Sequence, residues 1–287
     1  MAAWDRRTNT KRGEHIPNPV RPLPESTSRV LKRPADNDNL GLWLDKLGYR
    51  DAADGWSLKE NFRLDELKRV CKPWSITAAM DAQARWEALP MLDAGSPQAP
   101  GTLVKTTFSL HTEGHLLVDY GRASASESSV SMHWTFGCPR IPGSALKGLA
   151  RQHLSPVFAE RACGRAFDRD GSGHSGAVTF LDALPARGQF TLAPDVLTPH
   201  FGDYYQVNLN GEPGSREQPK LVPPADWLSP VPFTFLTVVD TSFAFILLAR
   251  QRDHEALTAA AETLREALLE WGVGAKTSAG YGGFRPL

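Results

Sequence analysis

The sequence predicts an α+β protein, and three observations support that fold class. Apolar and polar residues alternate with the period of a strand after residue 103, two later segments repeat apolar residues with the period of a helix, and two apolar runs are typical of buried strands. In chain order the predicted elements are strand 103–110, helix 144–154, strand 232–238, strand 243–249, helix 253–271 and strand 281–284. This order predicts a ferredoxin-like (RRM-like) domain over residues 102–287, with both helices on one face of the sheet.

Within that domain, two segments lie outside the basic pattern. A further alternation at 130–136 predicts another strand. Residues from about 163 to 230, rich in Gly, Asp and Pro, predict a large insertion after the first helix, with one apolar strand at 177–184. Trp271 occupies an apolar position of the helix at 253–271, so we expect it on the buried face.

Two segments precede the main domain. Residues 1–36 contain eight Arg and Lys residues, five prolines and few large apolar residues, so they cannot bury enough surface to offset chain entropy. We expect a basic arm there that is disordered or becomes ordered on a partner, and that either neutralises phosphates or is a solvated tail. Residues 37–101 combine an apolar group, two helical patterns and a Pro- and Gly-rich end, which predict a helical extension and a linker. Ser75 is the expected N-cap of the second helix.

The composition is that of a globular protein, because hydrophobic residues make up 41% and charged residues 22% of the chain. Lys plus Arg and Asp plus Glu are equal at 32 each, so any anion-binding surface must be local. Cys71, Cys138 and Cys163 form no CxxC pair, which argues against a disulfide framework and a cysteine zinc site. No apolar run is long enough to span a membrane. We therefore expect a cytoplasmic protein that requires no metal and no cofactor.

The first candidate anion site is the turn and helix at 140–151. Pro142-Gly143 predicts a turn, and Ser144 is the expected N-cap of the helix that follows. The free N–H groups and positive dipole end of this helix, with Lys147 and Arg151 on one face, are suited to phosphate. The alternative is an ordinary capped helix with solvated basic residues. Gly148 disfavours a helix, which indicates that something packs closely against it.

The second candidate is the glycine loop, residues 272–283, with sequence Gly-Val-Gly-Ala-Lys-Thr-Ser-Ala-Gly-Tyr-Gly-Gly. Glycines allow close approach and positive φ, so the loop can present bare N–H groups to an anion, while Lys276 and Thr277 add charge and a donor. A Walker nucleotide loop is excluded by Ala275 before the lysine and by a helix that precedes the loop. The alternative is a helix C-cap at Gly272 followed by a flexible tail.

Five spaced motifs carry a family resemblance. Residues 141–148 with Arg151, together with the loop at 272–282, resemble the RAMP superfamily of CRISPR-associated RNA-binding proteins. Residues 39–46, 176–183 and 195–205 narrow the resemblance to the sixth-subunit family of the type III-B (Cmr) effector complex. The resemblance covers the chain from about residue 37 to its end, and it leaves the basic arm without a counterpart.

The resemblance implies a non-catalytic, guide-RNA-binding subunit of an antiviral ribonucleoprotein. Such a subunit caps a filament of RAMP backbone subunits near the guide 3′ end and contacts target RNA, the small helical subunits and the 3′-end capping subunit. The residues implied to bind RNA are Arg140, Gly143, Ser144, Lys147, Arg151, Gly272, Gly274, Lys276, Thr277, Ser278, Gly280, Tyr281 and Gly282. In the insertion, His200, Tyr204 and Tyr205 would belong to a thumb-like element between subunits or against the duplex. From their residue types alone, these aromatics either stack on bases or anchor the insertion.

The strongest rival function is a RAMP-family endoribonuclease. Guide processing without a metal needs a general acid and base, for which histidine is suited. The candidates are His111, His115, His133, His153, His174 and His200. Metal-dependent target cleavage would instead use an aspartate in the loop after the first helix, where Asp168 and Asp170 lie; a solvated turn is the alternative.

Overall fold

We analysed a computed structural model, which describes residues 4–5, 10–11, 39–42, 44, 70–87, 103–120, 130–166, 171–199, 201, 223, 225, 227, 230 and 232–287. Most of the predicted arm and the first helical pattern of the extension lie outside these residues. In the arm, β1 (Trp4–Asp5) and β2 (Thr10–Lys11) form an antiparallel pair. Within the described part of the chain, no helix is both long enough and apolar enough to cross a bilayer.

The main sheet has the strand order β12-β4-β11-β7, and every pairing in it is antiparallel. A short additional strand, β8, also pairs with β11. The bounds are β4 (Leu103–Glu113), β7 (Val178–Phe180), β8 (Leu184–Pro185), β11 (Ser242–Arg250) and β12 (Gly283–Arg285). The predicted strands at 103–110 and 243–249 are therefore present, and they form the two central strands of this sheet.

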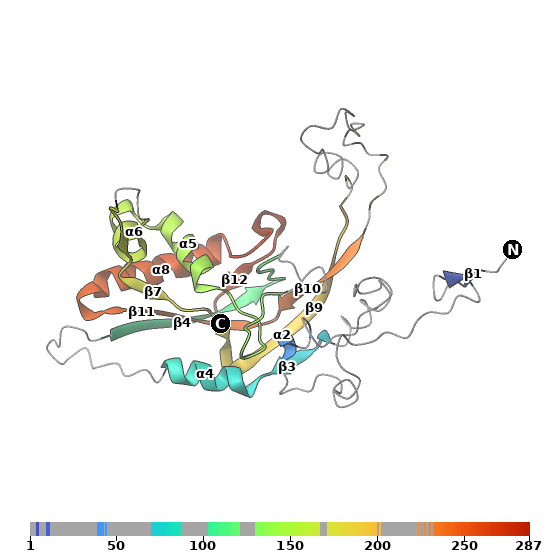
Figure 1. Ribbon diagram of the computed structural model, residues 1–287, viewed down its shortest axis with the longest axis horizontal. Coiled ribbons are helices and arrows are strands. Elements are labelled where there is room, and N and C mark those ends of the chain that lie inside the picture. The colour runs from blue at the N-terminus through green and yellow to red at the C-terminus, as the bar shows by residue number, and fades with distance from the viewer. Residues whose placement is uncertain are drawn as a thin grey trace.

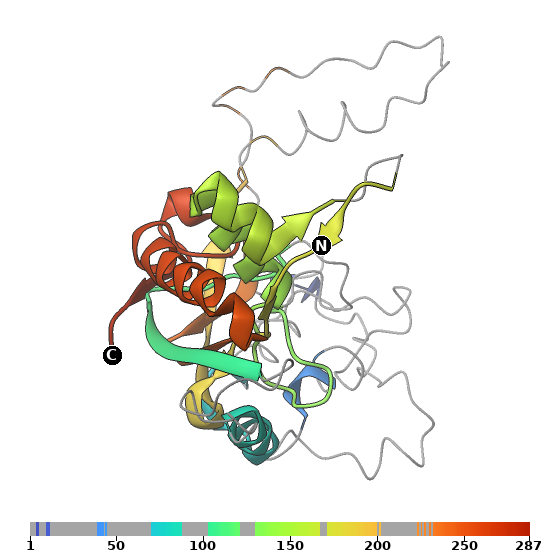
Figure 2. The same ribbon diagram turned by 90° about the vertical axis from the view of Figure 1, so that its left-hand side faces the viewer.

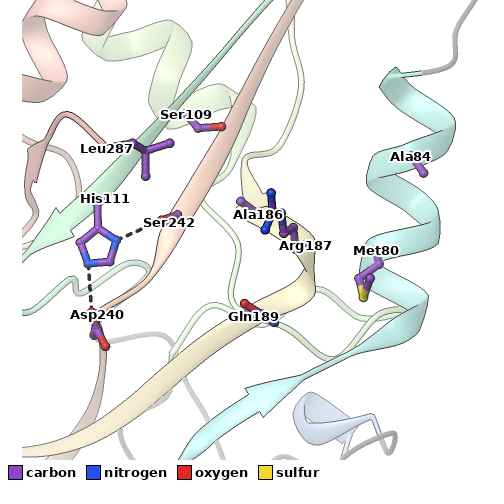
Figure 3. A pocket seen from close by; sticks show the side chains of 10 residues that line it. All are labelled: Met80, Ala84, Ser109, His111, Ala186, Arg187, Gln189, Asp240, Ser242 and Leu287. Atoms are coloured by element: carbon purple, nitrogen blue, oxygen red, sulfur yellow. Dashed lines mark hydrogen bonds and ion pairs between the residues drawn. The ribbon is translucent and has the colours of Figure 1, made fainter.

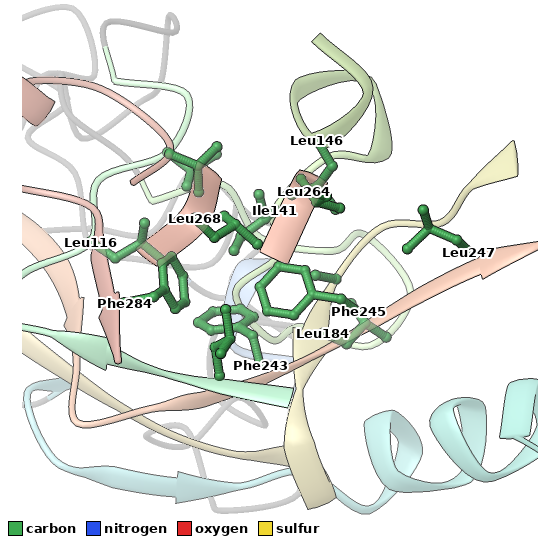
Figure 4. Close-up of a cluster of buried hydrophobic side chains, with 14 of the residues drawn as sticks. Leu116, Ile141, Leu146, Leu184, Phe243, Phe245, Leu247, Leu264, Leu268 and Phe284 are labelled. Atoms are coloured by element: carbon green, nitrogen blue, oxygen red, sulfur yellow. The ribbon is translucent and has the colours of Figure 1, made fainter. Parts of the chain in front are cut away.

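Three helices cover one face of this sheet, as Figures 1 and 2 show from two directions. They are α5 (Gly143–His153), α6 (Pro156–Cys163) and α8 (His254–Glu270). Side chains of β11 that point toward the helices are fully buried, among them Phe243 and Phe245. They pack with Leu264 and Leu268 of α8 and with Phe284 of β12 (Figure 4). Phe284 contacts both phenylalanines edge-on, with ring centroids 6.3 and 5.8 Å apart, and thereby fixes the terminal strand.

A second sheet lies beside the first, in the order β10-β9-β3. Its strands are β3 (Pro73–Ser75), β9 (Gln189–Leu197) and β10 (Phe233–Val239). Strands β9 and β10 form a continuous antiparallel ribbon from Thr191↔Val239 to Leu197↔Phe233, and the last part of the predicted insertion, residues 198–230, lies between the two strands in the chain. Helix α4 (Thr77–Glu87) packs on the 3-10 turn η2 (Ala186–Gly188) that leads into β9 (Figure 1).

The remaining elements are short. They are α2 (Leu40–Leu42), β5 (Gly164–Arg165), β6 (His174–Ser175), and the 3-10 turns η3 (Gln251–Asp253) and η4 (Thr277–Ala279). Strands β5 and β6 pair with each other. The mixed helix-and-sheet architecture predicted from the sequence is thus confirmed, with the helices of 144–154 and 253–271 close to their expected bounds.

Two strand predictions were wrong: one strand pairs in a different sheet, and one predicted strand does not form. The apolar runs at 232–238 and 243–249 are consecutive strands, but β10 pairs with β9 in the second sheet, and β7 takes the place beside β11. The segment 130–136 forms no continuous strand: Met132 makes one isolated bridge to Pro139, and residues 134–136 form a turn closed by the Gly137 N–H, which donates to the His133 carbonyl. Asn39 donates its side-chain amide to the Trp134 carbonyl at 2.6 Å and so brings the start of the extension onto this turn.

Four local predictions also differ from the structure. Ser75 belongs to β3, and α4 begins at Thr77. Ser144 lies inside α5, whose N-cap is Pro142. No described atom lies within 4 Å of the position of a Cβ on Gly148, so no part of the described chain packs closely there. Trp271 is 59% exposed rather than buried.

Candidate nucleic-acid interface

The first predicted anion site, the α5 turn (residues 140–147), already contains an acid from the same chain. The apolar run at 177–184 breaks between β7 and β8, and the break turns Asp182 toward the start of α5. Its Oδ1 accepts the Gly143 N–H at 2.8 Å, and its Oδ2 accepts from Arg140 Nη1 at 2.6 Å. A carboxylate at a helix N-terminus satisfies a free N–H and complements the dipole. Asp182 therefore occupies the place that the sequence assigned to a phosphate.

The glycine of this turn has a structural reason. A methyl group at Gly143 would collide with the Phe180 carbonyl oxygen, so only glycine allows α5 to begin against β7. Ser144 is exposed, and no described residue accepts its N–H. Sequence reasoning missed Asp182, although a single acid inside an apolar strand pattern was an available signal.

The two predicted cations of α5 face α6. Arg151 donates from Nη1 to the Gly164 carbonyl at 2.5 Å, at the residue that ends α6. The Lys147 carbonyl lies 3.9 Å from Cys163 Sγ. Burial raises the pKa of the Cys163 thiol, and the charges of Lys147 and Arg151 act in the opposite direction. Both cations thus lie near the C-terminal end of α6.

The glycine loop is held by its own backbone. Helix α8 has Trp271 as its C-cap, and Gly272 follows with φ +71°, so the helix stops where the sequence predicted, one residue before the expected cap position. A Cβ on Gly272 would collide with the Gly282 carbonyl oxygen, one on Gly282 with that of Val273, and one on Gly274 with that of Leu117. These three glycines therefore permit close approach between parts of this chain. A Cβ on Gly280 would meet no described atom within 4 Å.

The middle of the loop leaves amide groups open. Lys276 adopts the left-handed conformation, with φ 60° and ψ 33°, and the 3-10 turn η4 follows it. Within the described part of the chain, no acceptor pairs with the N–H of Lys276, Thr277 or Ser278, and the last two residues are exposed. Consecutive amides after a left-handed residue form a concavity suited to an anion. The Lys276 ammonium lies 5.6 Å from the ring centroid of Tyr120.

The end of the loop is tied to the β9–β10 ribbon. The Tyr281 hydroxyl donates to Asp195 Oδ2 at 2.6 Å. This hydrogen bond, burial and the carboxylate charge raise the pKa of Tyr281 to about 12. His115 Nδ1 lies 2.8 Å from the Thr237 hydroxyl and 3.6 Å from the same Asp195 carboxylate. The structure thus connects the loop to one of the motifs at 195–205.

Helix α5 contacts the end of α8, directly before the glycine loop, through residues that were not predicted to bind RNA. The His153 ring, in the last turn of α5, stacks on Trp271 with centroids 5.7 Å apart, directly before the glycine loop. At about 100° per residue, His153 lies about 200° around the helix from Arg151. The contact with the loop region therefore comes from the C-terminal end of α5, and the Lys147 and Arg151 face points elsewhere.

Of the candidate histidines, His111 has the surroundings best suited to acid–base chemistry. Its Nδ1 lies 3.0 Å from Ser242 Oγ and its Nε2 lies 3.1 Å from Asp240 Oδ1 (Figure 3). These groups line a cavity of about 800 Å³ between the main sheet, η2 and α4, which Arg187 also lines. His111 and Ser242 are direct cross-strand partners, so ordinary sheet packing also explains their contact.

The other described histidines have structural contacts. His133 stacks on Phe136 and accepts the Thr135 N–H at 3.3 Å, and burial and the Arg140 charge lower the pKa of its ring. His174 Nε2 lies 3.3 Å from the Glu160 carbonyl. His200, Tyr204, Tyr205, Asp168 and Asp170 lie outside the described residues. Among the residues that the structure does describe, no three His, Cys, Asp or Glu side chains gather as metal ligands.

Comparisons with known proteins identify the family. The CRISPR system Cmr subunit Cmr6 of Pyrococcus furiosus is 28% identical over 61% of this chain and 66% of its own length, just under two thirds. The Cmr6 subunit of Saccharolobus solfataricus is 33% identical over 26% of each chain. A chain in the cryo-EM structure of the type III-B Cmr-beta complex bound to cognate target RNA has the same fold, with a TM-score of 0.53 at 18% identity, covering 91% of this chain and 78% of that one. A model of the RAMP superfamily matches residues 110–285, which are more than half of the chain. The protein therefore belongs to the RAMP superfamily.

Proposed function

We propose that this protein is a guide-RNA-binding subunit of a type III-B CRISPR ribonucleoprotein and that it has no catalytic role. Its similarity to two Cmr6 subunits supports the choice of complex. In this proposal it caps the RAMP backbone filament near the guide 3′ end and supports recognition of target RNA. Its protein partners are a backbone subunit, the small helical subunit and the 3′-end capping subunit.

The glycine loop carries the proposal. Three consecutive N–H groups at 276–278 have no acceptor in the described chain, and a lysine stands beside them. Backbone donors and one cation recognise a phosphate without regard to base sequence, which a subunit that accepts many guides requires. Thr277 and Ser278 add hydroxyl donors, while Gly272, Gly274 and Gly282 shape the loop. Tyr281 holds the loop end to Asp195.

The α5 segment contributes in a second way. Lys147 and the exposed Arg151 attract phosphates electrostatically, and Ser144 offers one open N–H. Arg140 and Gly143 support this surface through Asp182. In the insertion, we assign His200, Tyr204 and Tyr205 to subunit contact.

The proposal includes a ferredoxin-like topology for the RAMP domain. The antiparallel order β12-β4-β11-β7, with α5 and α8 on one face, supports it. In this proposal the β9–β10 ribbon is the base of a thumb-like insertion. The continuous pairing of the two strands and the hydrogen bond from Tyr281 to Asp195 of β9 support this assignment.

Salt-dependent RNA binding tests the proposal. The full chain should bind a labelled single-stranded RNA, and Lys276→Ala should weaken binding about five- to tenfold and reduce the salt slope by about one. Arg265→Ala removes an exposed cation from α8 and serves as the matched control, with unchanged binding. The native complex should also co-purify with a guide RNA and sister subunits. If the wild-type chain bound no RNA and its complex contained none, the proposed function would be wrong.

One observation favours an endoribonuclease as a second candidate. His111, between Ser242 and Asp240 in a cavity, has the hydrogen-bonded surroundings of a general base. If this candidate is correct, the isolated chain cleaves repeat RNA without a metal and His111→Ala abolishes cleavage. Our proposal predicts no cleavage by either protein, with RNA binding unchanged in His111→Ala.

A further inference from the structure

Trp271 is an exposed aromatic residue with a fixed backbone. Its N–H donates to the Ala267 carbonyl at 2.8 Å, and Gly272 ends the helix directly after it. The residue is 59% exposed, although the inward face of α8 is fully buried. A large indole in water, fixed in position, loses little entropy when a partner covers it.

One face of the indole already has an aromatic neighbour. The His153 ring stacks on it with an interplanar angle of 27°. His153 itself is exposed, so the pair forms an aromatic step on the surface rather than part of the core. Because Trp271 is more than half exposed despite this contact, most of its surface remains open to a ligand.

The chemistry around this pair favours nucleic acid. The open amides of the glycine loop and Lys276 begin five residues along the chain, and they need acceptors and negative charge. The exposed residues of α8 include three acids, Glu262, Glu266 and Glu270, beside the cation Arg265, so the helix surface favours a polyanion less than the loop does. Tryptophan is also frequent in protein interfaces, but an apolar protein partner would leave the loop amides unpaired.

We propose that Trp271, supported by His153, stacks on one base of a single-stranded RNA whose phosphate lies on the glycine loop. This inference rests on the proposed function and adds a base contact to its phosphate contacts. Every base has a π-face, so the contact is independent of base identity and suits variable guide sequences. It also explains why an expected core position of α8 is occupied by an exposed indole.

A cycle of protein and RNA changes tests the stack. Affinity of the full chain is measured for an intact single-stranded RNA and for the same RNA without bases, using wild type, Trp271→Ala, Trp271→Phe and the control Trp134→Ala. Trp134 is 58% exposed and lies far from residue 271 in sequence, in the turn after Val130. Trp271→Ala should weaken binding of intact RNA by about five- to 150-fold, the range for one base on an aromatic ring. Trp271→Phe should retain most affinity, and Trp134→Ala should change nothing.

Two further readouts separate stacking from other effects. The salt slope should not change in Trp271→Ala, because no phosphate contact is lost. On base-free RNA, wild type and Trp271→Ala should bind equally. The stack is overturned if wild type and Trp271→Ala bind intact RNA with equal affinity, or if Trp271→Ala loses the same affinity for intact and for base-free RNA. If Trp271→Ala instead removes a sister subunit and leaves RNA affinity intact, the residue is a protein contact and the inference is wrong. If Trp271→Ala leaves RNA affinity unchanged while Lys276→Ala lowers it, only the stacking inference is wrong. If the wild-type chain binds no RNA, the proposed function is wrong as well.

Discussion

The α5 turn and the glycine loop contain similar residues, but within the described part of the chain only the α5 turn pairs its amide and its cation with an acid of the same chain. Each combines glycine, a hydroxyl residue and lysine near free backbone amides. In the α5 turn the first amide and Arg140 are both bound to Asp182. In the loop the amides at 276–278 have no acceptor in the described chain. The difference shows that one of the two predicted anion motifs is paired with an acid of this chain, whereas the other keeps amides without a described partner.

The glycines of these two segments fall into two groups, according to what a side chain at each position would meet. Gly143, Gly272, Gly274 and Gly282 each lie against backbone of this chain, whereas Gly148 and Gly280 meet open space. Close approach of glycine to backbone is therefore mainly an internal requirement here. The proposed RNA contact therefore depends on the part of the loop around Lys276 and Gly280.

Gly143→Ala should have the largest effect, because the added methyl group collides with the Phe180 carbonyl. We expect a loss of about 2–3 kcal/mol in the free energy of unfolding, as for overpacked sites. Gly148→Ala on the same helix is the control and should gain about 0.5–1 kcal/mol, since nothing obstructs its side chain. Denaturant unfolding measures both. Equal effects at the two positions would show that Gly143 is not a close-packed joint.

Asp182→Ala should destabilise the fold by about 2 kcal/mol, because α5 loses its cap and a partly buried Arg140 loses its partner. Asp182→Asn keeps an acceptor for Gly143 and should lose less. RNA affinity of the folded protein should not fall in either variant, since the acid is internal. A selective loss of RNA binding at full stability would place Asp182 in the interface instead.

Tyr281→Phe should destabilise the fold by about 1 kcal/mol, the value of one hydrogen bond. The folded pKa of about 12 lies above the unfolded value of about 10. The hydroxyl therefore contributes its full stability below pH 10 and loses it as pH rises from 10 to 12. The stability difference between wild type and Tyr281→Phe should shrink across that window. A difference that grew with pH would contradict the assigned hydrogen bond.

Lys147→Ala with Arg151→Ala should have the smallest effect. Because Arg151 is engaged with Gly164, we expect about a threefold loss of RNA affinity, smaller than that of Lys276→Ala. Filter binding at several salt concentrations measures it, with Arg265→Ala as the reference. A larger loss than that of Lys276→Ala would make α5 the principal RNA contact.

Sequence reasoning predicted the parts of this protein that depend on local pattern. The period of two at 103–110 and the helix ended by Gly272 were read correctly because side-chain burial repeats along the element. The pairing of β10 with β9 was missed, because two buried apolar runs joined by a short turn look the same in one sheet or two. Asp182 was missed because its partners are about 40 residues away in sequence, at separations of 42 and 39. The aromatic step at Trp271 was missed because helical periodicity assigns any apolar position to the core.

Hydrogen exchange with and without RNA tests the central claim most directly. The account predicts that amides at 276–278 exchange fast in the free chain and become protected when single-stranded RNA binds. The Gly143 amide, already bound to Asp182, should be protected in both states. Protection that appeared at residues 143–147 on RNA binding, with none at 276–278, would contradict the account.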